Sequence, residues 1–345
     1  MGTNRRHRMR HGRFLLKILT TAIILLGMGV WMIYALESDE AGIESSNAAN
    51  NGTVSAAESG GDDFDRLRAK WKTMLTGGDD YDQTSEPVRN YIRKLTNSVT
   101  NSSGTGVWDT MRPGDPAGLW KDLHSTSPRA MTEQFNRLRT MALAYSVQAS
   151  PLYGNKELRN DIETGLRWLQ ANRFYAQAEL SGNWWEWEIG TPMALKDILV
   201  LMADELPDAL VRYYLEALAY VVPNAAKRTI SGVDETGANL ADKALIVAVS
   251  GVLAKDAERI EAAVSALAPL FQYSVKGDGF YRDGSFIQHL NIPYVGSYGV
   301  VLLESLSQML YWLDGSPWSA EKSLPIDQIG EWYRDSYEPL MFEGA

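Results

Sequence analysis

A histidine, an asparagine and two tyrosines lie close together in the glycine-rich stretch 277–299. They are His289, Asn291, Tyr294 and Tyr298, and imidazole and phenol groups are among those that proteins use to transfer protons. Glycines and a proline break the stretch, so it cannot form a regular helix, and it is too polar for a core strand. Irregular backbone that presents such groups is typical of a surface that contacts a ligand. Taken singly, the histidine is more often structural, and a tyrosine at a helix start more often packs.

Three of the chain's eleven tryptophans lie in a second segment, SGNWWEWEIGTP, at residues 181–192. Trp184, Trp185 and Trp187 could be core anchors. Adjacent residues point in different directions on any regular element, however, so Trp184 and Trp185 cannot both face one core. We therefore expect at least one of them to line a groove, where a flat aromatic face can stack on a pyranose ring.

A third segment, DETGAN at residues 234–239, comes directly before a helical pattern. Asparagine is a common helix N-cap, because its side-chain oxygen accepts a hydrogen bond from a free backbone N–H of the first turn. On its own, Asn239 is therefore more simply interpreted as a cap than as a functional residue.

The rest of the body has the periodicity of helices. Apolar residues recur at intervals of three and four near 195–202, 245–252 and 302–310, and further helices are predicted near 64–75, 86–99, 128–148, 156–171, 207–222, 257–273 and 325–336. We count about ten helices and no convincing series of strands, so the predicted fold class is all-α. Long helices joined by short turns stack as antiparallel pairs.

The N-terminus has the pattern of an export signal. Basic residues precede an uncharged, mostly apolar run at 18–36, which is typical of secretory signals and close to the roughly 20 residues that a spanning helix needs. Residues 1–36 are therefore predicted to be a signal peptide or a retained signal anchor, 37–62 a flexible linker and 63–345 one globular domain. That domain would be secreted or tethered to the outer face of the cell membrane.

The predicted exported part is strongly acidic. Without the leader, 27 basic residues stand against all 43 acidic ones, which gives a formal charge of −16. Such a charge disfavours binding to nucleic acid or to an anionic membrane surface. The chain has no cysteine, which excludes disulfides and thiolate metal sites. No spacing suggests another metal-ligand set, and we predict a monomer that needs no cofactor.

The three segments together resemble polysaccharide lyase family 8, the hyaluronate, chondroitin and xanthan lyases. SGNWWEWEIGTP, TGAN and DGSFIQHLNIPYVGSYGVVLLESLSQML occur in the family's order, and the resemblance covers most of residues 64–345. It implies an incomplete α/α toroid with a polysaccharide cleft. It also implies catalytic positions at Asn239, His289 and Tyr298, and substrate-binding positions at Asn183, Trp184, Trp185 and Asn291.

The resemblance implies cleavage of a uronic-acid polymer by β-elimination, in which a proton leaves C5 and the O4 glycosidic bond breaks. The C5 proton lies beside an ionised carboxylate and is barely acidic, so that charge must first be neutralised. The amide of Asn239 can donate hydrogen bonds there without adding a base. Tyr298, with its phenol deprotonated, can take the C5 proton and then protonate the leaving oxygen, while His289 assists at C5 or holds the phenolate.

The sequence departs from the family's pattern at its C-terminal end. Family members continue into β-sandwich domains, and an arginine with a glutamate from the sandwich completes their site. This sequence ends at Ala345, and neither Arg282 nor Arg334 matches that arginine. We therefore expect a truncated chain with impaired activity.

Two other function classes stay open. A noncatalytic glycan-binding remnant would use the tryptophan cleft alone. A hydrolase would need two carboxylates, and the candidate pairs are Glu186 with Glu188 and Asp278 with Asp283, although acidic residues at such spacings are common on solvated loops. The residues do not distinguish hyaluronan, chondroitin and xanthan as substrates.

Overall fold

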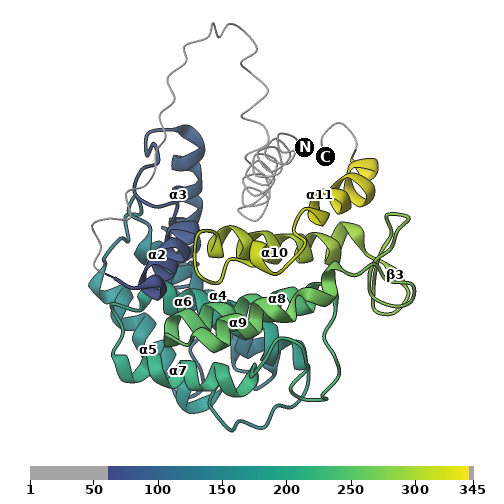
Figure 1. The fold of residues 1–345 in the computed structure, drawn as a ribbon. Helices are drawn as coiled ribbons and strands as arrows, with labels where there is room; N and C mark the ends of the chain where they lie inside the picture. The colour runs from purple at the N-terminus through teal and green to yellow at the C-terminus, as the bar shows by residue number, and fades with distance from the viewer. Residues whose placement is uncertain (1–60, 342–345) are drawn as a thin grey trace, which may run out of the picture.

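Helices dominate the fold. The computed structural model describes residues 61–341, so the predicted signal segment and nearly all of the predicted linker lie outside it. Ten α-helices follow one another along this part of the chain (Figure 1), in agreement with the all-α prediction. They are α2 (Asp63–Thr76), α3 (Glu86–Val99), α4 (Pro128–Ser146), α5 (Lys156–Asn172), α6 (Thr191–Met202), α7 (Asp208–Val221), α8 (Gly237–Ala254), α9 (Ala257–Ala266), α10 (Val300–Leu313) and α11 (Gln328–Trp332).

Polar caps fix where several of these helices begin. The Ser127 hydroxyl accepts a hydrogen bond from the N–H of Ala130 at the start of α4, and the Asn155 side chain accepts from the N–H of Leu158 at the start of α5. Each cap satisfies a donor that the first turn of a helix leaves free. Such residues are visible in the sequence, which is why the predicted starts of α4 and α5 agree with the structure.

Two predicted helices are shorter than expected. The pattern at 257–273 gives α9, which ends at Ala266, and then a 3₁₀ turn at Ala268–Phe271. Pro269 lies in that turn, and proline inside a helix removes a hydrogen bond and clashes with the preceding turn. The pattern at 325–336 gives the short α11 and then a π-helix at Tyr333–Tyr337.

Helices α6 and α8 form the centre of the molecule. Every residue of α8 from Gly237 to Val252 is buried, and most of them are apolar, as expected of a core helix. Helix α8 packs against α2, α6, α7, α9 and α10, while α4 packs against α3, α5 and α6. Within residues 61–341, α8 is also the one helix long and apolar enough to cross a membrane, but 89% of it is buried inside the fold, as in a core helix.

A pair of tryptophans joins α2 to α10, which is distant in sequence. The rings of Trp71 and Trp312 meet edge to face with 5.2 Å between centroids, and the Trp312 indole N–H donates to the Leu67 carbonyl oxygen over 2.7 Å. The Trp71 indole donates to Asp197 of α6 over 3.0 Å. Helix α2 therefore packs on both α6 and α10.

The stretch 277–299 contains a small antiparallel sheet that the sequence analysis did not predict. Strands β1 (Gly279–Phe280), β2 (Phe286–Gln288) and β3 (Ile292–Pro293) pair in the order β1-β2-β3, with Phe280 opposite Phe286. Both phenylalanines are buried, and Phe280 stacks on Trp332 with 4.4 Å between ring centroids. Strands of two and three residues are too short to produce an alternating pattern. The expectation that this stretch forms no regular helix holds only as far as Tyr294.

Candidate active site

The three predicted segments lie at the beginnings of three neighbouring core helices. The tryptophan segment leads into α6, the DETGAN segment into α8 and the histidine segment into α10. Helix α8 contacts both the π-helix before α6, Glu186–Gly190, and the π-helix before α10, Val295–Gly299. The fold therefore gathers segments that are far apart in sequence around the first turns of α8.

The residue types of these segments predict loops that interrupt the helical pattern, but each segment contains a π-helix. Trp184 and Trp185 are helical, Glu186–Gly190 continues them as a π-helix and α6 follows without a break. Val295–Gly299 leads into α10 in the same way. A π-turn inserts one extra residue into a helix and is frequent at functional sites. Such an insertion breaks the apolar spacing, which is why periodicity did not identify it.

His289, Tyr294 and Tyr298 form one aromatic cluster. The ring centroids of His289 and Tyr298 are 4.8 Å apart with their planes at 89°, and those of Tyr294 and Tyr298 are 5.0 Å apart. His289 is exposed to solvent, whereas Tyr298 is half-buried in the π-helix. The structure therefore brings the predicted histidine and tyrosine into direct contact.

The backbone at His289 adopts an uncommon conformation. His289 and Leu290 both have positive φ, 55° and 71°, which is rare for residues other than glycine. The N–H of Asn291 donates to the His289 carbonyl oxygen over 2.9 Å and closes a tight turn. This turn presents the imidazole to solvent beyond the end of β2. Asn291 is itself exposed, and its side chain bonds to none of the described residues.

Asn239 lies inside α8 rather than at its cap. The N-cap residue is Thr236, so Asn239 is the third residue of the helix. Its side chain is only 6% exposed and has no hydrogen-bond partner in residues 61–341. The donors of this amide are therefore free to bind a ligand. The interpretation of Asn239 as an N-cap is therefore wrong.

The three tryptophans of the second segment have three different environments. Trp187 is 7% exposed, stacks on Phe174 and donates to the Ser181 carbonyl oxygen over 2.8 Å, so it is the core anchor. Trp185 is 38% exposed and lines a cleft, as predicted for at least one of the pair. The ring of Trp184 is covered by the guanidinium of Arg228, 3.6 Å from its centroid.

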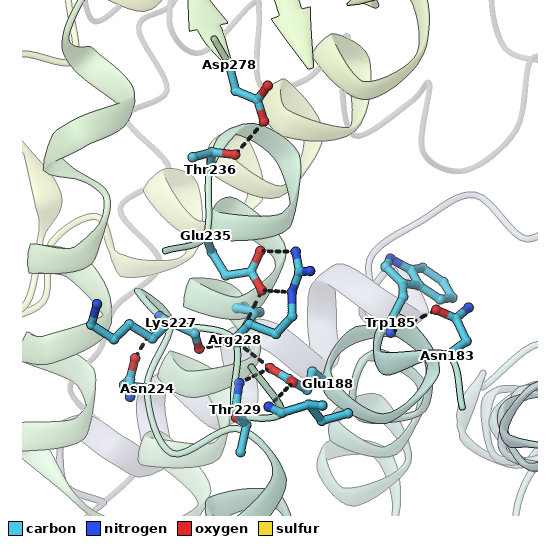
Figure 2. A network of polar contacts seen from close by, with 12 residues as sticks. Asn183, Trp185, Glu188, Asn224, Lys227, Arg228, Thr229, Glu235, Thr236 and Asp278 are labelled. Carbon is cyan, nitrogen blue, oxygen red and sulfur yellow. Dashed lines mark hydrogen bonds and ion pairs between the residues drawn. The ribbon is translucent and has the colours of Figure 1, made fainter. Parts of the chain in front are cut away.

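Asn183 holds the start of this helical segment. Its side-chain oxygen accepts a hydrogen bond from the Trp185 N–H over 3.3 Å (Figure 2). The rest of the Asn183 side chain is exposed. The contact seen for Asn183 is therefore with the backbone that carries Trp185.

A buried chain of alternating charges, which the sequence analysis missed, supports Trp184. Arg228 donates to Glu235 over 3.1 and 3.4 Å (Figure 2). Lys243 lies 3.8 Å from Glu235 and donates to Glu188 over 2.6 Å. Lys243 and Glu188 are fully buried. These residues lie on α8, on the π-helix before α6 and in the loop between α7 and α8, so no local pattern links them.

Both carboxylate pairs nominated for a hydrolase contain groups with structural roles. Glu188 accepts from Lys243 and from the backbone N–H of Thr229. Asp278 accepts from the Thr236 hydroxyl and from the backbone N–H of Leu290. Asp283 accepts from the N–H of Ser285, and that hydrogen bond lowers the pKa of its carboxyl. Glu188, Asp278 and Asp283 are thus each held by contacts within the protein, which does not favour either pair as the two carboxylates of a glycosidase.

A cleft of about 510 Å³ opens beside Trp185. Its walls come from α2, α3, α4, α6, α8 and α10, and include Asp242 and Val301. Asp242 follows Asn239 by three residues and Val301 follows Tyr298 by three, and residues three apart share a helix face. None of the three predicted catalytic residues lines the cleft itself.

Charged groups line this cleft. Arg139 donates to Asp197 over 2.6 Å and Lys196 donates to the other oxygen of Asp197 over 2.7 Å. Burial favours a raised pKa for Asp197, but the two cations outweigh it and lower that pKa. Burial raises the pKa of Asp242 to about 7, and the nearby carboxylate of Glu304 adds to the rise. In residues 61–341, no group of three or more histidine or acidic side chains is arranged to hold a metal ion.

Comparison with known proteins identifies the family. Residues 71–345 match the N-terminal alpha-helical domain of polysaccharide lyase family 8. This chain belongs to polysaccharide lyase family 8. It is 36% identical to the xanthan lyase of Bacillus sp. (strain GL1) over 82% of its own length and 30% of that protein. It is 38% identical to the hyaluronate lyase of Thermasporomyces composti over 82% of its own length and 35% of that protein.

Solved structures of family 8 lyases share the fold. The chondroitin AC lyase of Streptomyces coelicolor A3, solved in complex with chondroitin sulphate, matches with a TM-score of 0.73 and 35% identity, over 81% of this chain and 37% of that one. The Paenibacillus xanthan lyase matches with a TM-score of 0.73 and 36% identity, over 81% of this chain and 26% of that one. This chain thus spans about a third of the length of its family 8 relatives.

Proposed function

We propose that this chain carries the proton-transfer residues of a lyase that cleaves uronic-acid polysaccharides by β-elimination. The observation that carries the proposal is the contact between His289 and Tyr298, 4.8 Å between ring centroids. The π-helix that holds Tyr298 packs on α8, whose first turn contains Asn239. An unpartnered amide, an imidazole and a phenol are the groups that an elimination next to a carboxylate requires.

Asn239 neutralises the substrate carboxylate in this proposal. Its side-chain N–H groups donate to the uronate, so that negative charge developing at C5 spreads into the carboxylate. The side chain is nearly buried and makes no hydrogen bond within the described part of the chain, so its donors are free to bind substrate. A preorganised donor of this kind is worth about 10²–10³ in rate.

Tyr298 acts as base and then as acid. As the phenolate, it takes the C5 proton, and the electron pair of that C–H bond forms the C4–C5 double bond. The C4–O4 bond breaks with its electrons on O4, and the phenol returns the proton to that oxygen. One proton passes from carbon to oxygen, so no water is consumed. His289, in ring contact with Tyr298, stabilises the phenolate.

Trp185 provides the stacking surface for the polymer. Its exposed ring lines the cleft, and a flat aromatic face suits a pyranose. The substrate class is a uronic-acid polymer of the hyaluronan, chondroitin or xanthan type, a choice supported by the names of the relatives. Asn183 lies two residues before Trp185, Asn291 lies two residues after His289, and both are exposed. We propose that both contact sugar hydroxyls.

The proposal extends to the arrangement and location of the domain. The packing of consecutive helices, such as α4 on α5 and α8 on α9, supports the incomplete toroid of helix pairs that the family resemblance implies. The export signal predicted for residues 1–36 supports a location outside the cell, secreted or anchored. We propose that it acts as a monomer.

The test is to incubate the chain with hyaluronan, chondroitin and xanthan and to follow ultraviolet absorbance and reducing ends. The proposal expects an increase in absorbance from an unsaturated uronate. Reducing ends without that chromophore would contradict it.

A second candidate function is glycan binding without catalysis. The exposed face of Trp185 beside the cleft supports it, because this surface does not depend on Asn239, His289 or Tyr298. Saturable binding of the three polymers, with no new absorbance and no new reducing ends, would favour this candidate over the lyase.

A further inference from the structure

The turn at His289 requires support from outside itself. Two successive residues, His289 and Leu290, have positive φ, and such a backbone persists only where surrounding contacts determine it. Leu290 is exposed, so packing of its side chain does not hold the turn. The His289 ring packs on Tyr294 and Tyr298, and hydrogen bonds to the backbone hold the rest of the turn.

One carboxylate supplies that support and reaches a second element at the same time. Asp278 Oδ1 accepts the Leu290 N–H over 2.6 Å, and Asp278 Oδ2 accepts the Thr236 hydroxyl over 2.7 Å. Thr236 is the N-cap residue of α8, three residues before Asn239. Figure 2 shows Asp278 above the start of α8 with its carboxylate directed at Thr236. A hydrogen bond to an ionised acceptor is about twice as strong as a neutral one.

A second contact holds the same two elements together. Gln288, which precedes His289 and is 1% exposed, accepts the N–H of Ala238 and donates to the Thr236 carbonyl oxygen, each over 3.4 Å. A Cβ at Gly237 would lie 2.0 Å from Gln288 Oε1, and Gly237 has φ of 52°. Only glycine allows the end of β2 to approach the start of α8 this closely.

We propose that Asp278 is a positioning residue that clamps the His289 turn to the first turn of α8. Through Leu290 it fixes the backbone of the histidine, and through Thr236 it fixes the helix start that carries Asn239. The clamp thereby sets the distance between the groups that handle the proton and the group that neutralises the carboxylate. Its effect on rate rests on the proposed function, whereas its effect on the turn does not.

Thr236 offers a matched pair of variants. Thr236→Val removes the hydroxyl and keeps the shape, and Thr236→Ser keeps the hydroxyl. The valine variant should lower kcat by about 10- to 100-fold with KM nearly unchanged, because small misplacements of reacting groups cost up to about 10²-fold. The serine variant should restore kcat. Asp283→Asn is the control, because Asp283 accepts only from its own turn, at Ser285.

The rate of hydrogen exchange at the Leu290 N–H measures how firmly the clamp holds the turn, and the measurement does not require catalytic activity. Thr236→Val should speed exchange of this N–H, Thr236→Ser should not, and Asp283→Asn should leave it unchanged. Equal exchange in Thr236→Val and the original chain would overturn the proposal. Faster exchange with unchanged kcat in an active chain would also overturn it, because the clamp would then not position the reacting groups. If the chain makes no unsaturated product, the proposed function fails, and the exchange rates still decide whether the clamp exists.

Discussion

The rings of His289 and Tyr298 stand at 89° to each other with 4.8 Å between their centroids. They come from two different elements, the turn after β2 and the π-helix before α10. Tyr294 packs on Tyr298 at 5.0 Å and on His289 at 6.0 Å. This contact places the exposed imidazole of His289 against the half-buried phenol of Tyr298.

Removing the Tyr298 hydroxyl should abolish turnover and spare binding. Tyr298→Phe keeps the ring and its packing, so the loss should be about 10²- to 10⁴-fold in kcat, the range for one proton-transfer group. Tyr294→Phe is the matched control in the same cluster and should lose little. Initial rates of absorbance increase give kcat and KM for both. Turnover retained in Tyr298→Phe would contradict the role of the phenol.

Substitutions of Asn239 and Asn291 should change different kinetic constants. Asn239→Ala should lower kcat by about 10²- to 10³-fold, because it removes a preorganised donor that acts on developing charge. Asn291→Ala should act mainly on KM, because Asn291 is exposed on the turn. Steady-state kinetics on one polymer measure both. Equal effects of the two variants on kcat would show that Asn239 has no special role.

Substitutions of Trp185 and Trp187 should affect different properties, polymer binding for the first and stability of the fold for the second. Trp185→Ala should weaken polymer binding by roughly 2- to 10-fold, since stacking contributes about 0.5–1.5 kcal/mol, and should leave the melting temperature nearly unchanged. Trp187→Ala should destabilise the fold by about 3–5 kcal/mol, because Trp187 is the buried one. Polymer titration and urea unfolding separate the two effects. A large loss of stability in Trp185→Ala would show that it too is a core anchor.

The buried charge chain should behave as a structural unit. Lys243→Met leaves Glu188 buried without its cation, whereas Glu235 keeps Arg228, and breaking a buried pair costs about 3–5 kcal/mol. The double variant Glu188→Gln with Lys243→Met should cost less than Lys243→Met alone, since the uncompensated charge at 188 is gone. Urea unfolding of the single and double variants completes the comparison. Additive losses would mean that the two residues do not interact.

Asp242 should make stability depend on pH. Its folded pKa is raised by burial from 3.8 to about 7, so between those values the folded state holds a proton that the unfolded state releases. The contribution of Asp242 to the free energy of unfolding is therefore largest below about pH 4, falls as the pH rises to 7 and is level above. At 1.36 kcal/mol per pKa unit, the loss is about 4 kcal/mol.

Asp242→Asn should remove this dependence. The asparagine oxygen can still accept from the Ser305 hydroxyl, which donates to Asp242 over 2.5 Å. The variant and the original chain should have the same free energy of unfolding below about pH 4. At pH 8 the variant should be more stable by up to about 4 kcal/mol. Free energies of unfolding in urea across this range test it. A difference between the two proteins that does not change with pH would contradict the raised pKa.

Much of the fold follows from spacing and caps in the sequence. Ser127 and Asn155 mark helix starts that the structure has at the same positions. The unpredicted parts depend on contacts between distant residues or on very short elements. The strands around Phe280 and Phe286 are too short for a pattern, and their stability comes from packing on Trp332.

The candidate site was only partly visible in the sequence. Residue types and motifs pointed to His289, Tyr298 and Trp185, and the structure places the first two in ring contact and leaves Trp185 partly exposed. The supporting residues were not identified. Arg228 covers Trp184 from a loop about 40 positions away in sequence, and Asp278 reaches Thr236 over a similar separation. Only the folded backbone brings such pairs together.

The most direct test of β-elimination is the mass of the products. The chain is incubated with hyaluronan, chondroitin and xanthan, and the oligosaccharides are weighed by mass spectrometry. Elimination through Tyr298 predicts fragments that end in an unsaturated uronate and are each one water lighter than hydrolysis products. Fragments that have gained one water for each bond cleaved would contradict the account.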